Sequence, residues 1–176
     1  MKLQTEIVHH VLIRTNSNKA NINIEERISL ARRTLYSLIK SGVHGTNGLN
    51  PRTSYNIDQV YVIPRLLYGL ATVHLLKKDL ELLTNFHLNT IKRLQALPNR
   101  TATATVYLLF GATPIIAETH KRQLSLLFSI ATCTNTSIRN VAWKQAALGS
   151  EHIFFTKIVN ILHIYKLHEF RTIMNG

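Results

Sequence analysis

Basic residues recur in pairs along the sequence, and binding of phosphate groups is the chemistry that they could perform. Guanidinium and ammonium groups form charge-assisted hydrogen bonds with phosphate oxygens. Such contacts hold a protein on a nucleic acid without reading its base sequence. We therefore predict that the basic residues on outward helix faces bind nucleic acid: Arg32, Arg33, Lys40, Lys92, Arg93, Arg100, Lys121 and Arg122.

Acidic residues are too few and too dispersed to suggest a self-contained metal site. The chain has 9 Asp and Glu in total, and its aspartates are Asp58 and Asp79. Polymerases and nucleases hold divalent metal ions with clustered carboxylates. Glu25 and Glu26 are adjacent, but neighbouring residues of a helix point in different directions. The sequence also lacks glycine-rich phosphate-loop and Cys-x-x-Cys motifs, so we expect no catalytic residue and no metal ligand.

Three residues that could do other chemistry lie in apolar surroundings. His87 and His120 fall within apolar stripes of expected helices, where a core histidine is commoner than a catalytic one. Trp143, the only tryptophan, could stack on a base, but the alanines and valine around it favour core packing. We interpret all three as structural.

Length and composition define the framework that must position these residues. The 176 residues suffice for one domain with a substantial core. A formal net charge of +12 favours polyanionic partners. With 7 Gly and 4 Pro the chain has few helix breakers, which favours a helical fold.

Hydrophobic periodicity predicts a mainly α protein, a helical bundle of five to seven helices. A first helix is expected from an Asn23 cap to Gly42, and Pro64 should kink or break an apolar segment over 54–76. Further helices are expected over 78–97, 114–131, 137–148 and 150–165. The β-branched run at 6–15 predicts a short N-terminal strand or hairpin remnant, giving a strand and loop region at 1–22 before a helical domain at 23–176.

Several blocks extend the interpretation by resemblance to a known family. They are NIEERISLARRTLYSLIKSGVHGTNGLNP at 23–51, YVIPRLLYGL at 61–70, LELLTNFHLNTIKRLQALP at 80–98 and ETHKRQLSLL at 118–127. In this order they resemble the region after the palm in reverse transcriptases of non-long-terminal-repeat retrotransposons. The resemblance covers most of the chain and implies a thumb-like domain and the helical connector that follows it, with VHHVLIRT at 8–15 resembling the hairpin after the palm.

The resemblance also implies what the chain lacks. The family's polymerase centre needs a Tyr-x-Asp-Asp turn, and the sequence contains no Asp-Asp dipeptide. We therefore expect a non-catalytic, C-terminal fragment of an RNA-directed DNA polymerase that would contact the template-primer backbone. Its implied partners are an RNA–DNA or DNA duplex and the missing palm and fingers. The chain itself is expected to hold no cofactor, whereas the full-length enzyme would use Mg²⁺.

Two other functions remain open at this stage. The chain could be an orphan helical protein-interaction module with no nucleic-acid role, whose apolar faces once packed on the missing palm. A helix-turn-helix DNA reader is a third interpretation, but no second helix combines base-reading residues with a tight turn. The uncharged stretches are too short to cross a membrane, and the N-terminus does not resemble a secretory signal. We expect an intracellular protein, nuclear or cytoplasmic, that is not secreted and has no membrane partner.

Overall fold

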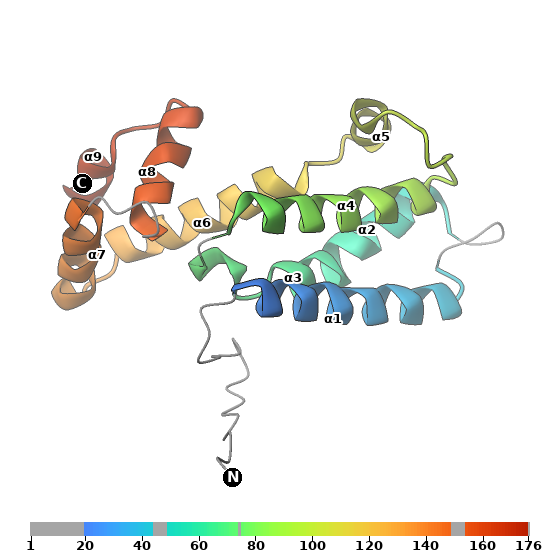
Figure 1. The fold of residues 1–176 in the computed structure, drawn as a ribbon, viewed down its shortest axis with the longest axis horizontal. Coiled ribbons are helices and arrows are strands. Elements are labelled where there is room, and N and C mark those ends of the chain that lie inside the picture. Colours follow the sequence, from blue (N-terminus) through green and yellow to red (C-terminus); the bar gives the residue numbers. More distant parts are fainter. Residues whose placement is uncertain (1–19, 44–48, 74, 149–153, 176) are drawn as a thin grey trace, which may run out of the picture. The chain divides into compact units, whose positions relative to one another are not determined.

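The computed structural model describes residues 20–43, 49–73, 75–148 and 154–175, and these residues are mainly helical (Figure 1). The expected helical class is confirmed. The predicted strand at 6–15 lies outside the described residues, which themselves contain no strand. The chain divides into two compact units. Unit 1 comprises the described residues up to Gly69 with Leu75–Ile116, and unit 2 those of Leu70–His74 and Ala117–Gly176.

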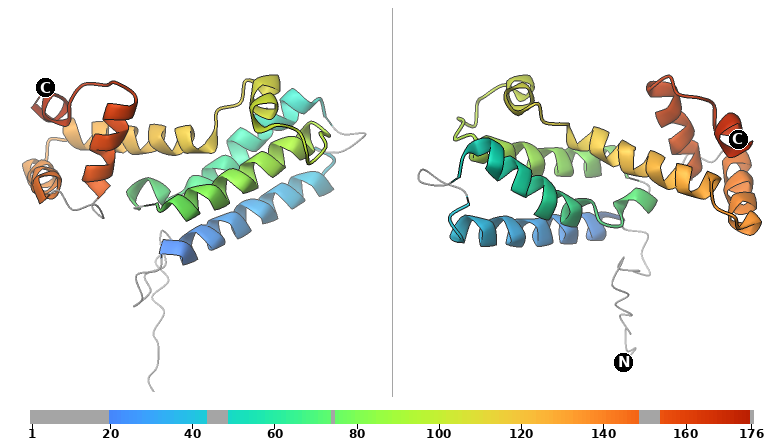
Figure 2. Two further views of the ribbon diagram at one scale, coloured as in Figure 1. Left: turned by 45° about the horizontal axis from the view of Figure 1, so that its top comes forward. Right: turned by 180° about the vertical axis from the view of Figure 1, so that it is seen from behind.

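Unit 1 contains five helices: α1 (Ala20–Lys40), α2 (Pro51–Tyr61), α3 (Ile63–Leu67), α4 (Lys77–Leu94) and α5 (Thr103–Phe110). Helix α1 packs against α3 and α4, and α2 also packs against both of these helices. By the sequence colouring, α1 and α4 run in the same direction and α2 runs in the opposite direction (Figures 1 and 2). Unit 1 is therefore a small helical bundle in which α1 and α4 are neighbours.

The core of unit 1 forms from one stripe of each long helix. On α1 the buried apolar residues are Ile24, Ala31 and Leu35, at helical spacing. On α4 the fully buried residues Leu83 and Ile91 are two turns apart. The faces beside these stripes are left available for other roles.

Helix α1 begins earlier than predicted and ends where predicted. The prediction that Asn23 caps this helix is wrong, because the helix already includes Ala20. At the other end Gly42 has a positive φ of 78°, and its N–H donates to the Ile39 carbonyl at 3.0 Å. The next N–H, of Val43, donates to the Leu38 carbonyl at 3.1 Å. These two hydrogen bonds form the Schellman motif that glycine favours at a helix C-terminus.

The apolar segment over 54–76 is broken near Pro64, as predicted. Helix α2 ends at Tyr61, and Pro64 lies in the first turn of α3, where its missing N–H costs little. The expectation of an apolar segment is wrong for α2. That helix buries Ser54 and Asp58 while exposing Val60 and Tyr61.

Side-chain contacts connect α1 with α3 and the residue after it. The guanidinium of Arg65 donates from Nη1 to the Thr34 hydroxyl at 2.7 Å, and this hydroxyl donates to the Leu30 carbonyl at 3.1 Å. The Arg27 guanidinium lies 5.3 Å from the centroid of the Tyr68 ring, a cation–π arrangement. Two arginines thus hold α1 and the α3 region together, the buried Arg27 and the exposed Arg65.

Unit 2 contains the 3-10 helix η1 (Leu70–Thr72), most of α6 (Ile115–Ala131), α7 (Thr136–Leu148), α8 (Phe154–Ile164) and α9 (Phe170–Asn175). Helices α7 and α8 pack together. The sequence-based expectation did not include α5 or α9, which are short. The predicted start of a helix at residue 150 lies outside the described residues.

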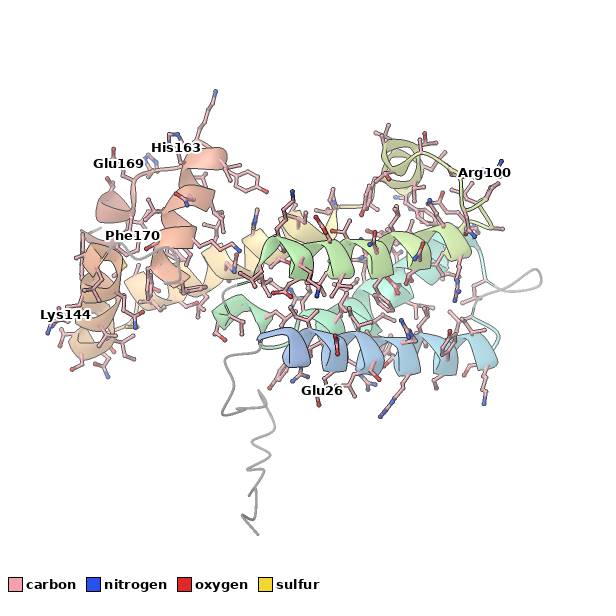
Figure 3. All side chains as sticks on the ribbon, viewed as in Figure 1. Glu26, Arg100, Lys144, His163, Glu169 and Phe170 are labelled. Carbon is pink, nitrogen blue, oxygen red and sulfur yellow. The ribbon has the colours of Figure 1, made fainter. Side chains whose placement is uncertain are left out.

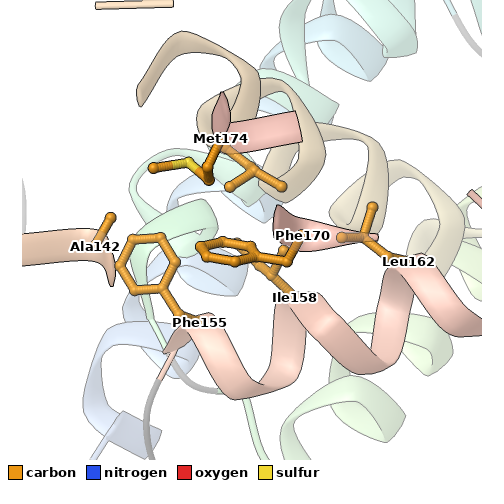
Figure 4. Close-up of a cluster of buried hydrophobic side chains, with 7 residues drawn as sticks. Ala142, Phe155, Ile158, Leu162, Phe170 and Met174 are labelled. Carbon is orange, nitrogen blue, oxygen red and sulfur yellow. The ribbon is translucent and has the colours of Figure 1, made fainter. Parts of the chain in front are cut away.

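The core of unit 2 is aromatic and aliphatic (Figure 4). Phe155, Ile158 and Leu162 of α8 lie with Phe170 of α9 in one buried cluster. Trp143 of α7 packs against this cluster, and its ring is nearly perpendicular to that of Phe170, with centroids 5.4 Å apart. The tryptophan therefore contributes to the core, as predicted, with part of its ring exposed.

Candidate nucleic-acid interface

An open cleft of about 490 Å³ lies between α1 and α4 within unit 1. From α1 it is lined by Glu25, Ile28, Ser29, Arg32, Leu35 and Tyr36. From α4 it is lined by Leu82, Asn85, Phe86, Asn89, Thr90 and Arg93. The cleft therefore combines arginines, amides and aromatic rings over an apolar floor.

Helical periodicity explains why these residues meet. The lining positions on each helix are separated by one, three or four residues, so they share one face of that helix. This face lies beside the core stripe, which explains why Leu35 lines the cleft floor although it is only 4 % exposed. Because α1 and α4 run in the same direction, Glu25 and Leu82 lie towards one end of the cleft and Tyr36 and Arg93 towards the other.

Two of the predicted nucleic-acid-binding residues meet in this cleft. Arg32 comes from α1 and Arg93 from α4, and both side chains are exposed. Of the residues that line the cleft, Glu25 alone carries a carboxylate, and it lies a full two turns before Arg32 on α1. The arrangement leaves the Arg93 end of the cleft positively charged.

Other predicted residues of unit 1 lie outside the cleft. Arg33 and Lys40 are exposed on α1. Arg100 is exposed in the segment between α4 and α5, from which its side chain projects (Figure 3). All three remain accessible to a polyanion.

Lys92 does not have the outward position that we predicted from the helical wheel. Its side chain is only 8 % exposed, and its ammonium donates from Nζ to the Asn99 carbonyl at 2.7 Å. This bond holds the segment after α4 against the end of that helix, where the Leu97 N–H also donates to the Lys92 carbonyl. Lys92 thus has a structural role, because the chain folds back over its side chain after Leu94.

Lys121 and Arg122 lie on the part of α6 that belongs to unit 2. The Lys121 side chain is exposed, and that of Arg122 is partly buried. One residue earlier, His120 Nδ1 lies 3.2 Å from the Tyr165 hydroxyl, and the two rings meet edge to face. Burial and the positive charge of Lys157 lower the pKa of His120. His120 therefore has a structural role, as predicted.

Two buried ionisable groups of unit 1 have no hydrogen-bond partner in the described part of the chain. Both oxygens of Asp58 and both ring nitrogens of His87 lack one. Burial raises the pKa of Asp58 to about 7 and lowers that of His87 to about 4, because each interior site disfavours the charged form. The centroids of the His87 and Tyr107 rings lie 5.9 Å apart. Burial raises the pKa of Tyr107, as it raises that of Asp58. The expectation that His87 is a core residue agrees with its 1 % exposure.

The aspartates do not fit the Mg²⁺ that the resemblance implies for a full-length enzyme. Asp58 is fully buried, and the Asp79 carboxylate accepts a hydrogen bond from the Leu76 N–H at 3.0 Å, which caps α4. Among the described residues, no group of three or more His, Cys, Asp or Glu side chains could hold a metal ion. We therefore derive no metal-dependent step for this chain.

The cleft also contains residues that we did not predict. Asn85 and Asn89 are exposed and one turn apart, with Arg93 one turn further, so the three form a polar line on α4. This line is visible in the sequence as a repeat of polar residues every four positions. The aromatic residues Tyr36 and Phe86 gave no such signal, because one aromatic residue on each of two helices forms no pattern in the sequence.

No protein-family model matches the chain, and no curated protein or solved structure matches it either. None of the helices in the described residues is both long and apolar enough to cross a membrane.

Proposed function

We propose that this chain is a non-catalytic, C-terminal piece of a retrotransposon-type reverse transcriptase that contacts the backbone of a template-primer duplex. One observation supports the nucleic-acid role most directly. Arg32 and Arg93, which are far apart in the sequence, are brought to one open cleft by two adjacent helices. Convergent arginines are a common means of binding phosphate groups.

The surrounding charges support the same role. Arg33, Lys40 and Arg100 are exposed in the same unit, and the whole chain carries a net charge of +12. A basic surface of this kind binds phosphates through counterion release and is largely indifferent to base sequence. The absence of an Asp-Asp dipeptide and the structural positions of Asp58 and Asp79 support a non-catalytic role.

Binding to RNA–DNA hybrids of two unrelated sequences tests this function. We expect similar affinities for both hybrids, and a steep loss of affinity between about 50 and 200 mM salt. Each phosphate contact should contribute about 0.9 to the slope of log affinity against log salt concentration. Affinity that does not change with salt, or that differs strongly between the two sequences, would contradict the proposal.

A protein-interaction module with no nucleic-acid role is the second candidate, favoured by one apolar patch. Leu108 and Leu109 on α5 are 80 % and 61 % exposed. Contiguous exposed apolar surface is a feature of protein–protein interfaces. Gel filtration and a binding assay distinguish the two candidates. The interaction module is favoured if the wild type forms oligomers, if the double variant Leu108→Ser/Leu109→Ser does not form them, and if the wild type does not bind the hybrid at low salt.

A further inference from the structure

The cleft between α1 and α4 is too narrow for a base-paired duplex to enter. Helices that pack against each other have axes about 8–10 Å apart. A DNA duplex is wider than this spacing, because its major groove alone is about 12 Å wide. A duplex could therefore reach only the rim, where Arg32 and Arg93 are exposed. The cleft volume of about 490 Å³ is instead in the range that accommodates small molecules and single nucleotides.

Aromatic rings in the cleft suit the flat faces of bases. Tyr36 is 48 % exposed, so its ring is accessible, and Phe86 is partly buried on the opposite helix. Proteins that bind single strands stack bases on such rings, and stacking tolerates any base because every base has a π-face. A duplex has no free base faces to offer except at its ends.

Polar groups in the cleft suit the other parts of a nucleotide. Asn85 and Asn89 are exposed, and each amide offers both donors and acceptors that can meet an unpaired base edge. Arg93 lies one turn beyond Asn89, where it can hold the phosphate of the same strand. The cleft from Leu82 to Arg93 spans about 16 Å along α4, which is enough for a short stretch of strand.

We infer that this cleft receives unpaired nucleotides of a strand that continues beyond the duplex. The bases would stack on Tyr36 and Phe86, and Arg32 and Arg93 at the rim would bind the phosphates at the junction between the duplex and the unpaired strand. This inference rests on the proposed function, because it places the duplex on the basic rim. An acidic peptide is disfavoured as occupant, since it could pair with Arg32 and Arg93 but has no flat base faces to stack on Tyr36 and Phe86.

Hybrids with and without an unpaired extension test the inference on the full chain. A blunt RNA–DNA hybrid is compared with the same hybrid carrying about six unpaired RNA nucleotides, a length within the site sizes of single-strand binding proteins. One well-stacked base corresponds to about a fivefold gain in affinity or more, so we expect at least this gain from the extension.

Two exposed tyrosines provide a matched pair of variants. Tyr36→Leu removes a ring from the cleft, and Tyr61→Leu removes a similarly exposed ring (55 %) from α2. Tyr36→Leu should abolish most of the gain from the extension, so that this variant binds the blunt hybrid and the extended hybrid with similar affinity. Tyr61→Leu should keep the gain, and Phe86→Leu, which retains apolar volume, should lose it. Circular dichroism and thermal unfolding verify that each variant is folded.

The outcomes separate this inference from the proposed function. If the blunt hybrid binds but the extension adds nothing, or if Tyr36→Leu keeps the gain, the inference is wrong and the proposed function stands. If the blunt hybrid does not bind but the unpaired strand binds with the same dependence on Tyr36, the proposed duplex contact is wrong and the cleft assignment stands. A polyglutamate peptide that binds as tightly and depends equally on Tyr36 would overturn the inference.

Discussion

Arg32 on α1 and Arg93 on α4 line the same cleft, although the whole of α2 and α3 separates them in the chain. The folded bundle thus creates a local concentration of positive charge that neither helix has alone. In a chain with few acidic residues, the presence of both arginines in the lining of one cleft distinguishes a candidate interface from a generally basic surface.

Lys92 is expected to affect stability and not nucleic-acid binding. Lys92→Met keeps the aliphatic stem but removes the hydrogen bond to the Asn99 carbonyl. Because hydrogen bonds to charged groups contribute more than neutral ones, we expect a loss of about 1–3 kcal/mol in the free energy of unfolding, measured with urea. Lys78→Met, at an exposed position of α4, is the control and should unfold like the wild type. Unchanged stability in Lys92→Met with a strongly reduced salt slope would contradict this assignment.

Asp58 and His87 should oppose each other in the pH dependence of stability. The pKa of Asp58 rises from 3.8 to about 7 on folding, so its contribution to stability falls as the pH rises through this window. The pKa of His87 falls from 6.5 to about 4, so its contribution rises as the pH increases from about 4 to 6.5. In the wild type the two effects of these residues largely cancel between about pH 4 and 6.5.

Asp58→Asn should make the contribution of His87 to the pH dependence of stability measurable. With Asp58 unable to ionise, only the His87 contribution remains, and the free energy of unfolding should increase between about pH 4 and 6.5. The slope can reach about 1.36 kcal/mol per pH unit for one proton. Urea unfolding at a series of pH values measures it. A decrease in stability over the same range would show that Asp58 is not the buried carboxyl responsible.

His87→Leu should give the opposite dependence of stability on pH. The variant retains apolar volume beside Tyr107 but removes the titrating ring, which leaves Asp58 to dominate. Its stability relative to the wild type should therefore decline as the pH rises from about 4 to 6.5, at a slope similar in size and opposite in sign to that of Asp58→Asn. The same urea series tests it, and a rising profile in this variant would refute the burial of a neutral His87.

Local sequence signals predicted much of the fold. Gly42 was identified as a helix end because glycine accepts a positive φ, and Pro64 as a break because proline lacks an N–H. The start of α1 was misplaced because Asn23 is a good cap in isolation, yet the helix continues to Ala20. The burial of Asp58 could not be predicted, since a lone aspartate on a helix is usually exposed.

The candidate site was only partly predictable, because it depends on tertiary structure. The sequence predicts Arg32 and Arg93 on outward helix faces, but only the packing of α1 against α4 brings them to one cleft. The same prediction is wrong for Lys92, because the segment after Leu94 turns back and covers it. Helical periodicity describes one element at a time and contains no information on what folds over it.

The salt dependence of hybrid binding in two charge-matched double variants tests the central claim most directly. Arg32→Ala/Arg93→Ala removes both arginines of the cleft, and Arg52→Ala/Lys144→Ala removes two exposed basic residues that do not line it. Lys144 projects from α7 in unit 2 (Figure 3). If the cleft arginines each contact a phosphate, the slope of log affinity against log salt concentration should fall in magnitude by about 1.8 in the first variant and much less in the second. Equal slopes in the two variants would contradict the assignment of the α1–α4 cleft as the nucleic-acid interface.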